Sequence, residues 1–270
     1  MMPAGLMRWI IGDIHGMLRP LEKLLAAIDR ADTKAELFFC GDFVNRGPES
    51  RGVVELVMSK PRVKACRGNH DETFDYLLSG KCFVSYGQAG GLVTTFEHFM
   101  KYGLEQTLLS YHLPWTKIDA VRRNPSPTAI AELLAPIPAD HRQFFRALPA
   151  VHDEDDFFVA HAKWDVDESA GVPTFQQQMA RSLKLRHEII WGRFTDEEID
   201  ITKPWSRPGF FGHTPVSVYK RGRNMQPIQG DNLVLLDTAA AVHAEGRLSA
   251  WCFEEARCLQ VNRQGEGVPA

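Results

Sequence analysis

Apolar residues along the first third of the chain form two alternating patterns, short continuous runs and longer stretches with one apolar face. Nearly continuous apolar runs predict strands of a sheet that is covered on both faces, and apolar residues every three or four positions, as from Leu18 to Ile28, predict a helix. The predicted order is strand, helix, strand, helix, strand, at residues 6–11, 17–31, 35–40, 49–60 and 62–66.

The pattern becomes irregular between about residues 79 and 150, where prolines interrupt probable helices. Aromatic residues of this segment include Tyr86, Phe96, Phe99, Tyr102, Tyr111 and Trp115. We expect a mostly helical insertion over one end of the sheet. Further strands are expected at 156–160, 209–212, 232–237, 248–253 and 257–261. Because no linker or low-complexity run divides the 270 residues, we expect one α/β domain spanning 1–270.

Composition says more about the cellular compartment of the protein than about its function. A net charge of −3 gives no overall attraction to nucleic acid polymers or anionic membranes, and no apolar stretch approaches the length of a membrane span. The start of the chain predicts a strand and not a signal peptide. Five scattered cysteines, with no C-x-x-C pair, indicate free thiols and not a disulfide framework. We therefore expect a cytoplasmic protein; the sequence does not specify its oligomeric state.

Short polar clusters follow the predicted strands. The segments 12–16, 41–47 and 67–71 each come directly after one of the first three strands, and His161 and His213 follow two later ones. Because the carboxyl ends of parallel strands share one edge of a sheet, the clusters should converge there. Each cluster alone is more typical of a turn, since Asp, Asn and Gly are common turn residues. Their joint occurrence predicts a site of carboxylates and imidazoles, which suits manganese, iron or zinc.

The clusters also resemble a known family pattern. Gly-Asp-Ile-His-Gly, Gly-Asp-Phe-Val-Asn-Arg-Gly, Gly-Asn-His-Asp, the later histidine and the final Gly-His are similar to the motifs of calcineurin-like metallophosphoesterases, and more narrowly of short bacterial and phage PPP phosphatases. The segments around Asp237 and Gly246 resemble the closing strands of that family. The resemblance implies two mixed sheets packed as a sandwich, with helices on the outer faces.

The resemblance implies a centre of two divalent metal ions, with manganese expected first and iron or zinc as alternatives. One ion would be held by Asp13, His15 and Asp42. The residues that would hold the second ion are Asp42, Asn69, His161 and His213. Asp42 would bridge the two ions, and a shared hydroxide would attack phosphorus in line, without a phosphoenzyme.

The same resemblance implies the residues that handle the phosphate. His70 would protonate the leaving oxygen as a general acid. Arg46, Asn69 and Arg193 would bind the phosphate, since guanidinium forks match its oxygens, although each arginine could instead form a structural salt bridge. Many relatives have aspartate where this chain has Asn45. Asparagine can accept a hydrogen bond from His70 but brings no charge, so we expect a lower pKa for His70 than an aspartate would give.

Three functions remain open on these residues. The Asn45–Ser50 and Asn69–Asp71 segments are similar to symmetrical diadenosine tetraphosphate hydrolases, whereas 161–164, 190–193 and 212–215 are closer to protein serine/threonine phosphatases. We expect a phosphorylated protein as the substrate first and a dinucleoside polyphosphate second. A metal-binding interaction module without catalysis is the alternative from another class. Phe99, Tyr111 or Trp115 could stack an adenine, although a small core of the insertion explains such aromatic residues equally simply.

Overall fold

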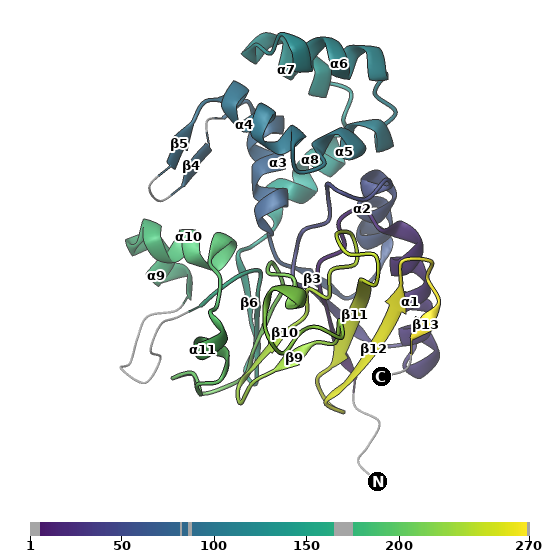
Figure 1. Cartoon of the computed structure of the whole chain (residues 1–270), viewed down its shortest axis with the longest axis vertical. Coiled ribbons are helices and arrows are strands. Elements are labelled where there is room, and N and C mark those ends of the chain that lie inside the picture. The colour runs from purple at the N-terminus through teal and green to yellow at the C-terminus, as the bar shows by residue number, and fades with distance from the viewer. Residues whose placement is uncertain (1–5, 82, 86–87, 165–174, 269–270) are drawn as a thin grey trace.

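Two mixed β-sheets form the centre of the computed structural model, which describes residues 6–81, 83–85, 88–164 and 175–268 (Figure 1). The first sheet contains, in spatial order, β13 (Gly267–Val268), β12 (Arg257–Asn262), β11 (Arg247–Cys252), β1 (Arg8–Ile11), β2 (Glu36–Phe39) and β3 (Val63–Ala65). The second contains β6 (Val151–Asp153), β7 (Phe158–Ala160), β8 (Gly209–Phe211), β10 (Leu233–Leu235) and β9 (Ile228–Gln229).

Each sheet has a parallel centre. In the first, β2 pairs in parallel with both β1 and β3, and β1 pairs antiparallel with β11. In the second, β8 pairs in parallel with both β7 and β10. The prediction of parallel strands in the first third is confirmed, and three strands from each sheet point their carboxyl ends toward one edge.

Apolar side chains from both sheets fill the space between them. Ile10 and Phe38 from the first sheet share one buried cluster with Val159, Phe210 and Val234 from the second. Side chains alternate between the faces of a strand, so the neighbouring positions face outward and need a cover of their own. That cover is α1 (Leu18–Ala31) and α2 (Ser50–Ser59) on the first sheet. The second is covered by α9 (Phe175–Arg181), α10 (Leu183–Trp191) and α11 (Asp196–Ile199). The expected sandwich with helices outside is therefore confirmed.

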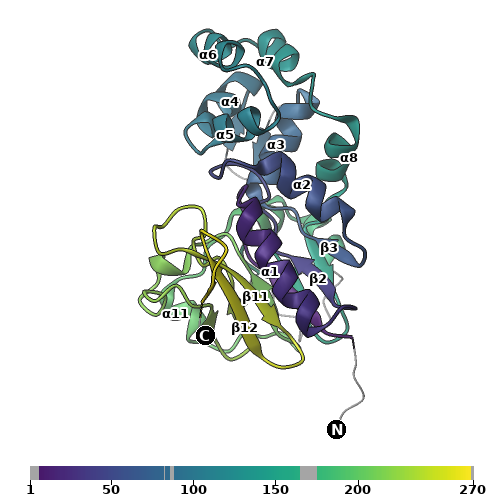
Figure 2. The ribbon, with the colours of Figure 1, turned by 90° about the vertical axis from the view of Figure 1, so that its right-hand side faces the viewer.

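A helical layer covers the edge where the parallel strands end (Figures 1 and 2). It consists of α3 (Asn69–Ser79), α4 (Leu92–Met100), α5 (Leu104–Ser110), α6 (Trp115–Arg123), α7 (Pro127–Leu134) and α8 (Ala139–Ala147), with a small hairpin of β4 (Phe83–Ser85) and β5 (Gln88–Gly90). Arg142 fastens α8 to α3 by donating to the Leu78 carbonyl at 2.8 Å. The expected cover of helices is present over the sheet edge.

The helices begin ten residues earlier than the expected insertion. α3 starts at Asn69 because Gly68, in extended conformation, occupies the N-cap position. Asp71 lies in the first turn, where its negative charge interacts favourably with the helix dipole. Asn, His and Asp resemble a turn in sequence, which conceals this helix start. The strands β6, β9 and β13 were also not anticipated, since two or three residues show no period. The helices α9 to α11 were not anticipated either.

No described helix is long and apolar enough to cross a membrane. Four cysteines, Cys40, Cys66, Cys252 and Cys258, are free thiols. Cys82 and Tyr86 lie outside the described residues.

Candidate active site

The predicted metal ligands meet at the shared edge of the two sheets. Asp13 and Asp42 follow β1 and β2, and Asn69 follows β3 as the first residue of α3. His161 and His213 follow β7 and β8 of the opposite sheet. All five side chains are buried. The structure thus brings together residues that are up to 200 positions apart in the sequence.

The backbone at this edge is held in conformations that side chains rarely adopt. Five of its non-glycine residues have positive φ angles between 47° and 71°, namely His15, Asp42, Asn45, Arg46 and His213. Such a conformation costs about 1–3 kcal/mol for each residue and persists only where the surroundings impose it. Strain of this kind concentrates at functional sites.

Two glycines allow the carboxylates to approach the backbone. A Cβ atom at Gly68 would lie 2.1 Å from Asp42 Oδ1, and one at Gly212 would lie 2.0 Å from Asp13 Oδ1. Both distances are far inside van der Waals contact, so any other residue would displace a carboxylate. Asp71 holds the same loop, since its carboxylate accepts from the Asp42 N–H at 2.7 Å and the Phe43 N–H at 2.9 Å.

Asp42 lies between two groups of donor atoms. On one side, His15 Nε2 lies 3.3 Å from Asp42 Oδ2 and 3.9 Å from Asp13 Oδ2. On the other side, His161 Nε2 lies 3.5 Å from Asp42 Oδ2. This arrangement matches the expectation that Asp42 belongs to both halves of a two-metal centre, which remains a prediction here.

Asn69 joins the histidines of the second group. Its Oδ1 lies 3.0 Å from His161 Nε2 and 2.9 Å from His213 Nδ1. His161 Nδ1 lies 2.9 Å from the Cys40 carbonyl oxygen, and His15 Nδ1 lies 2.9 Å from that of Val44. Metal-binding histidines commonly donate their second ring nitrogen in this way, so that the unprotonated Nε2 can bind a cation.

The electrostatics of the edge favour a cation. Burial raises the pKa of Asp42 to about 7 and that of Asp13 well above its usual value. Burial also lowers the pKa of His161 to about 4, which keeps the ring neutral. Several buried carboxylates without a balancing charge are unfavourable, whereas a divalent ion stabilises ionised carboxylates beside neutral imidazoles. The donor set therefore fits the predicted pair of divalent metals.

His70 lies next to this centre with Asn45 and Arg46. Asn45 Nδ2 lies 2.8 Å from His70 Nδ1, while Thr107 Oγ1 donates to Asn45 Oδ1 at 3.0 Å. Asn45 therefore donates to the ring, opposite to the expected direction, because the Thr107 hydroxyl occupies its oxygen. Burial, followed by the Arg46 charge, lowers the pKa of His70 well below its usual value. The comparison with an aspartate at position 45 stays a prediction.

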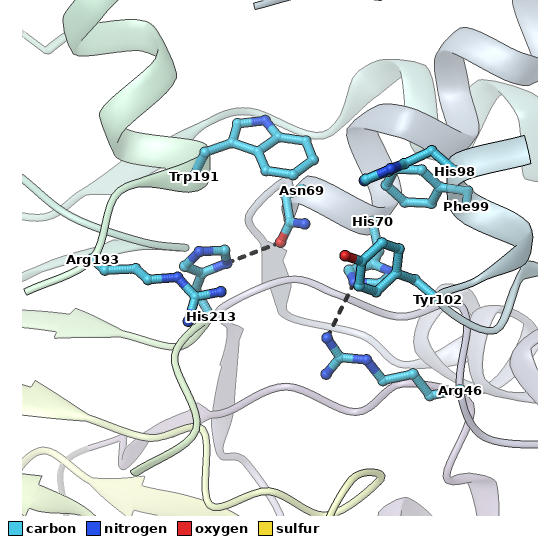
Figure 3. Close-up of a pocket in the computed structure, with 9 residues that line it drawn as sticks. All are labelled: Arg46, Asn69, His70, His98, Phe99, Tyr102, Trp191, Arg193 and His213. Carbon is cyan, nitrogen blue, oxygen red and sulfur yellow. Dashed lines mark hydrogen bonds between the residues drawn. The ribbon is translucent and has the colours of Figure 1, made fainter. Parts of the chain in front are cut away.

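A cavity of about 210 Å³ opens beside the donor atoms (Figure 3). Arg46 and Arg193 enter it from different elements, with Arg193 beside His213 and Arg46 beside His70. Arg46 Nη1 lies 2.8 Å from His15 Nε2 and Nη2 lies 3.3 Å from His70 Nε2. Both predicted arginines, and Asn69, thus line one cavity.

Aromatic side chains form the remaining walls of this cavity, and most were not predicted for this role. His98, Phe99 and Tyr102 line one side and Trp191 the other. The Trp191 indole donates to Glu72 Oε2 at 3.1 Å, which ties the end of α10 to α3. Of the three aromatic residues proposed for stacking, only Phe99 lines the cavity.

Tyr111 and Trp115, the other two candidates for stacking, instead contact residues of the helical layer. Tyr111 is buried, with its hydroxyl 2.8 Å from His141 Nδ1. Trp115 is 45% exposed, and the Arg122 guanidinium lies 5.5 Å from the centre of its ring. For Tyr111, packing in the small core of the insertion is therefore the better explanation. No sequence signal distinguished Tyr102, and Trp191 was singled out only as part of segment 190–193, because an aromatic residue indicates burial and not which cavity it reaches.

Comparison with known proteins agrees with this geometry. The family model of the calcineurin-like phosphoesterases matches residues 8–216, so the chain belongs to that family. The predicted family resemblance is thereby confirmed.

The relatives include symmetrical bis(5'-nucleosyl)-tetraphosphatases. That of Bordetella pertussis (strain Tohama I) is 46% identical over 65 residues, which is 23% of this chain and 24% of the relative. That of Legionella pneumophila (strain Corby) is 44% identical over 73 residues, 27% of this chain and 26% of the relative. The matched part spans only about a quarter of each relative's own length.

A solved structure shares the fold over most of its length. The metallophosphoesterase from Sphaerobacter thermophilus superposes with a TM-score of 0.52 at 17% identity, covering 98% of this chain and 88% of that one. At this identity the likeness concerns the fold alone, and it supports the sandwich described above.

Proposed function

We propose that the chain is a two-metal phosphatase that hydrolyses phosphoserine or phosphothreonine in proteins. The observation that carries this proposal is the small cavity beside the donor atoms, with an arginine on either side. Its volume of about 210 Å³ lies below the roughly 300–1,000 Å³ of pockets that enclose drug-sized ligands. It has room for one phosphoryl group on a short side chain, whereas the two nucleosides of a dinucleotide would have to lie outside it.

Each residue of the site has a role in this reaction. On the family resemblance, Asp13, His15 and Asp42 would hold one ion, and Asp42, Asn69, His161 and His213 the second, with manganese the first expectation. A pair of divalent ions supplies, when bound, an activated water and charge neutralisation for in-line displacement. Arg46 and Arg193 would grip the phosphate oxygens through their guanidinium forks.

His70 would protonate the oxygen of the departing serine or threonine. Its Nε2 belongs to the cavity side of the ring, because Nδ1 is occupied by Asn45. Protonation of an alkoxide leaving group is the step that needs such a donor, since an alkoxide is a poor leaving group. Asn45 orients the ring and is a positioning residue.

A second candidate is symmetrical hydrolysis of dinucleoside tetraphosphates. Two observations favour it: the names of the relatives, and the aromatic rings of Tyr102 and Trp191 at the cavity. Bases stack well on such rings, with roughly 1–3 kcal/mol for each base.

A comparative assay separates the two substrates. Manganese-loaded enzyme should show a higher kcat/KM on a phosphoserine peptide than on diadenosine tetraphosphate. A preference of a hundredfold or more for the dinucleotide would reverse the ranking.

A simpler assay tests whether the protein is a metal-binding module without catalytic activity. Hydrolysis of p-nitrophenyl phosphate should be measurable with wild-type protein, lost in Asp42→Asn and lowered in His70→Asn. Inactivity of the wild type with manganese, nickel, cobalt, iron and zinc alike would revive the module.

A further inference from the structure

Asp237 is a buried carboxylate that the ligand assignments above do not use. It is 2% exposed and lies just beyond the end of β10. Its Oδ1 accepts the Ala239 N–H at 2.9 Å, but its Oδ2 has no hydrogen-bond partner among the described residues. An unpartnered buried carboxylate oxygen is costly unless a cation or a bound water satisfies it.

The backbone places Asp237 at the metal-binding edge. β10 pairs in parallel with β8 so that Leu235 lies opposite Phe211, and two residues further along lie Asp237 and His213. The Val216 N–H donates to the Asp237 carbonyl at 2.8 Å, which binds this segment to the loop after His213. Asp237 therefore ends its strand beside a predicted ligand.

The opposite sheet approaches the same segment closely. A Cβ atom at Gly12 would lie only 2.2 Å from the carbonyl oxygen of Leu236. Gly12 precedes Asp13, so the backbones that carry Asp13 and Asp237 touch across the sandwich.

The charge of Asp237 acts on the predicted ligands. It raises the pKa of Asp13 more than the charge of Asp42 does, although the Asp13 and Asp42 side chains offer ligand atoms within 4.8 Å of one another. Burial raises the pKa of Asp237, and the charges of Arg46, His161 and Arg193 act against that rise. The carboxylate thus lies in the same electrostatic field as the donor atoms.

We infer that Asp237 is an outer carboxylate of the metal centre, which acts through water on the ion held by Asp13 and His15 and strengthens its binding. The inference rests on the proposed two-metal centre. Asp13 and Asp42 supply two negative charges, whereas two divalent ions carry four positive charges. A further buried carboxylate reduces that imbalance, and this explains why its unpartnered oxygen is retained at the edge.

An isosteric substitution separates this role from a purely local one. Asp237→Asn keeps an oxygen for the Ala239 N–H and removes only the charge. Metal-free protein would be titrated with Mn²⁺ by calorimetry, without substrate. We expect the affinity for one of the two ions to fall roughly 10- to 100-fold, as for other outer partners of metal ligands, while the other ion binds normally.

Thermal melts of the same variant give a second readout. Without metal, Asp237→Asn should melt at the same or a higher temperature than the wild type, because a buried unpaired charge is removed. With saturating Mn²⁺ its gain in melting temperature should be smaller. A variant that melts lower than the wild type without metal, or fails to fold, would show a structural role and overturn the inference.

Asp119→Asn is the matched control. Asp119 lies on α6 in the helical layer, its side chain is 15% exposed, and it pairs with Arg122 and Arg123. It should bind Mn²⁺ as the wild type does. Unchanged isotherms for Asp237→Asn, or an equal loss in Asp119→Asn, would overturn the inference. Because no substrate is present, failure of the proposed phosphatase activity would leave this result interpretable.

Discussion

The edge that carries the predicted metal ligands and the aromatic wall of the cavity, formed by His98, Phe99, Tyr102 and Trp191, meet at His70 but are built differently. At the edge, strand ends, strained backbone and close glycines leave almost no freedom to the carboxylates of Asp13 and Asp42. The wall is formed by side chains from α4, from the turn that follows it and from the end of α10, and one of them, Tyr102 in that turn, is 47% exposed. The difference indicates that the chemistry is rigidly specified, while substrate recognition can vary by replacing single side chains.

The largest effect should come from crowding the edge. In Gly212→Ala the new methyl group would lie 2.0 Å from Asp13 Oδ1 and displace the carboxylate. Because a misplacement of about 1 Å can cost on the order of 100-fold in rate, we expect at least that loss in kcat/KM on p-nitrophenyl phosphate. Metal analysis of the purified variant should show less than the wild-type manganese content.

Gly91→Ala is the control for this substitution. A Cβ atom at Gly91 meets nothing within 4 Å, and the residue precedes α4 with a negative φ of −67°. It should keep wild-type activity. Equal activity in Gly212→Ala would contradict the rigid edge.

A smaller effect, which differs between substrates, is expected from a change in α5 where it contacts Asn45. Thr107 Oγ1 on α5 accepts the Asn45 N–H at 2.8 Å and donates to Asn45 Oδ1 at 3.0 Å. Thr107→Val should therefore release the amide that orients His70. We expect kcat to fall about 10-fold on a phosphoserine peptide, whose leaving group needs a proton, and less on p-nitrophenyl phosphate.

Thr107→Ser keeps the hydroxyl and should restore the rate on the peptide. If Thr107 had a purely structural role, Thr107→Val would lower kcat equally on both substrates. That outcome would show that α5 does not act through His70.

The smallest effect should come from the wall. Tyr102→Ala removes one exposed ring, so we expect a rise in KM of about 2- to 5-fold on a phosphopeptide, equivalent to about 1 kcal/mol or less, with kcat unchanged. Trp115→Ala is the matched control, since Trp115 is 45% exposed and does not line the cavity. A large fall in kcat for Tyr102→Ala would show that the wall belongs to the catalytic machinery.

The sequence predicted the edge better than the wall for a physical reason. A buried parallel strand shows as an apolar run, and the polar residues after it must lie at the carboxyl edge, so Asp13, Asp42 and His161 could be placed from local pattern. Helical periodicity shows which side of a helix is apolar but not where the helix docks. Tyr102 and Trp191 therefore became cavity residues only in the folded chain.

Two other features escaped prediction for local reasons. Asn69 and His70 belong to the first turn of α3, and residues that favour turns conceal a helix start. Asp237 follows an apolar strand in the same manner as Asp13 does, yet the family pattern assigned it no role. Its unpartnered oxygen is visible only in the structure.

The most direct test of the two-metal centre is anomalous X-ray scattering from crystals grown with manganese, combined with Asp42→Asn. We predict two manganese ions for each chain, both bonded to Asp42, and loss of p-nitrophenyl phosphate hydrolysis in the variant. A single ion away from Asp42, or full hydrolysis by Asp42→Asn, would contradict this prediction.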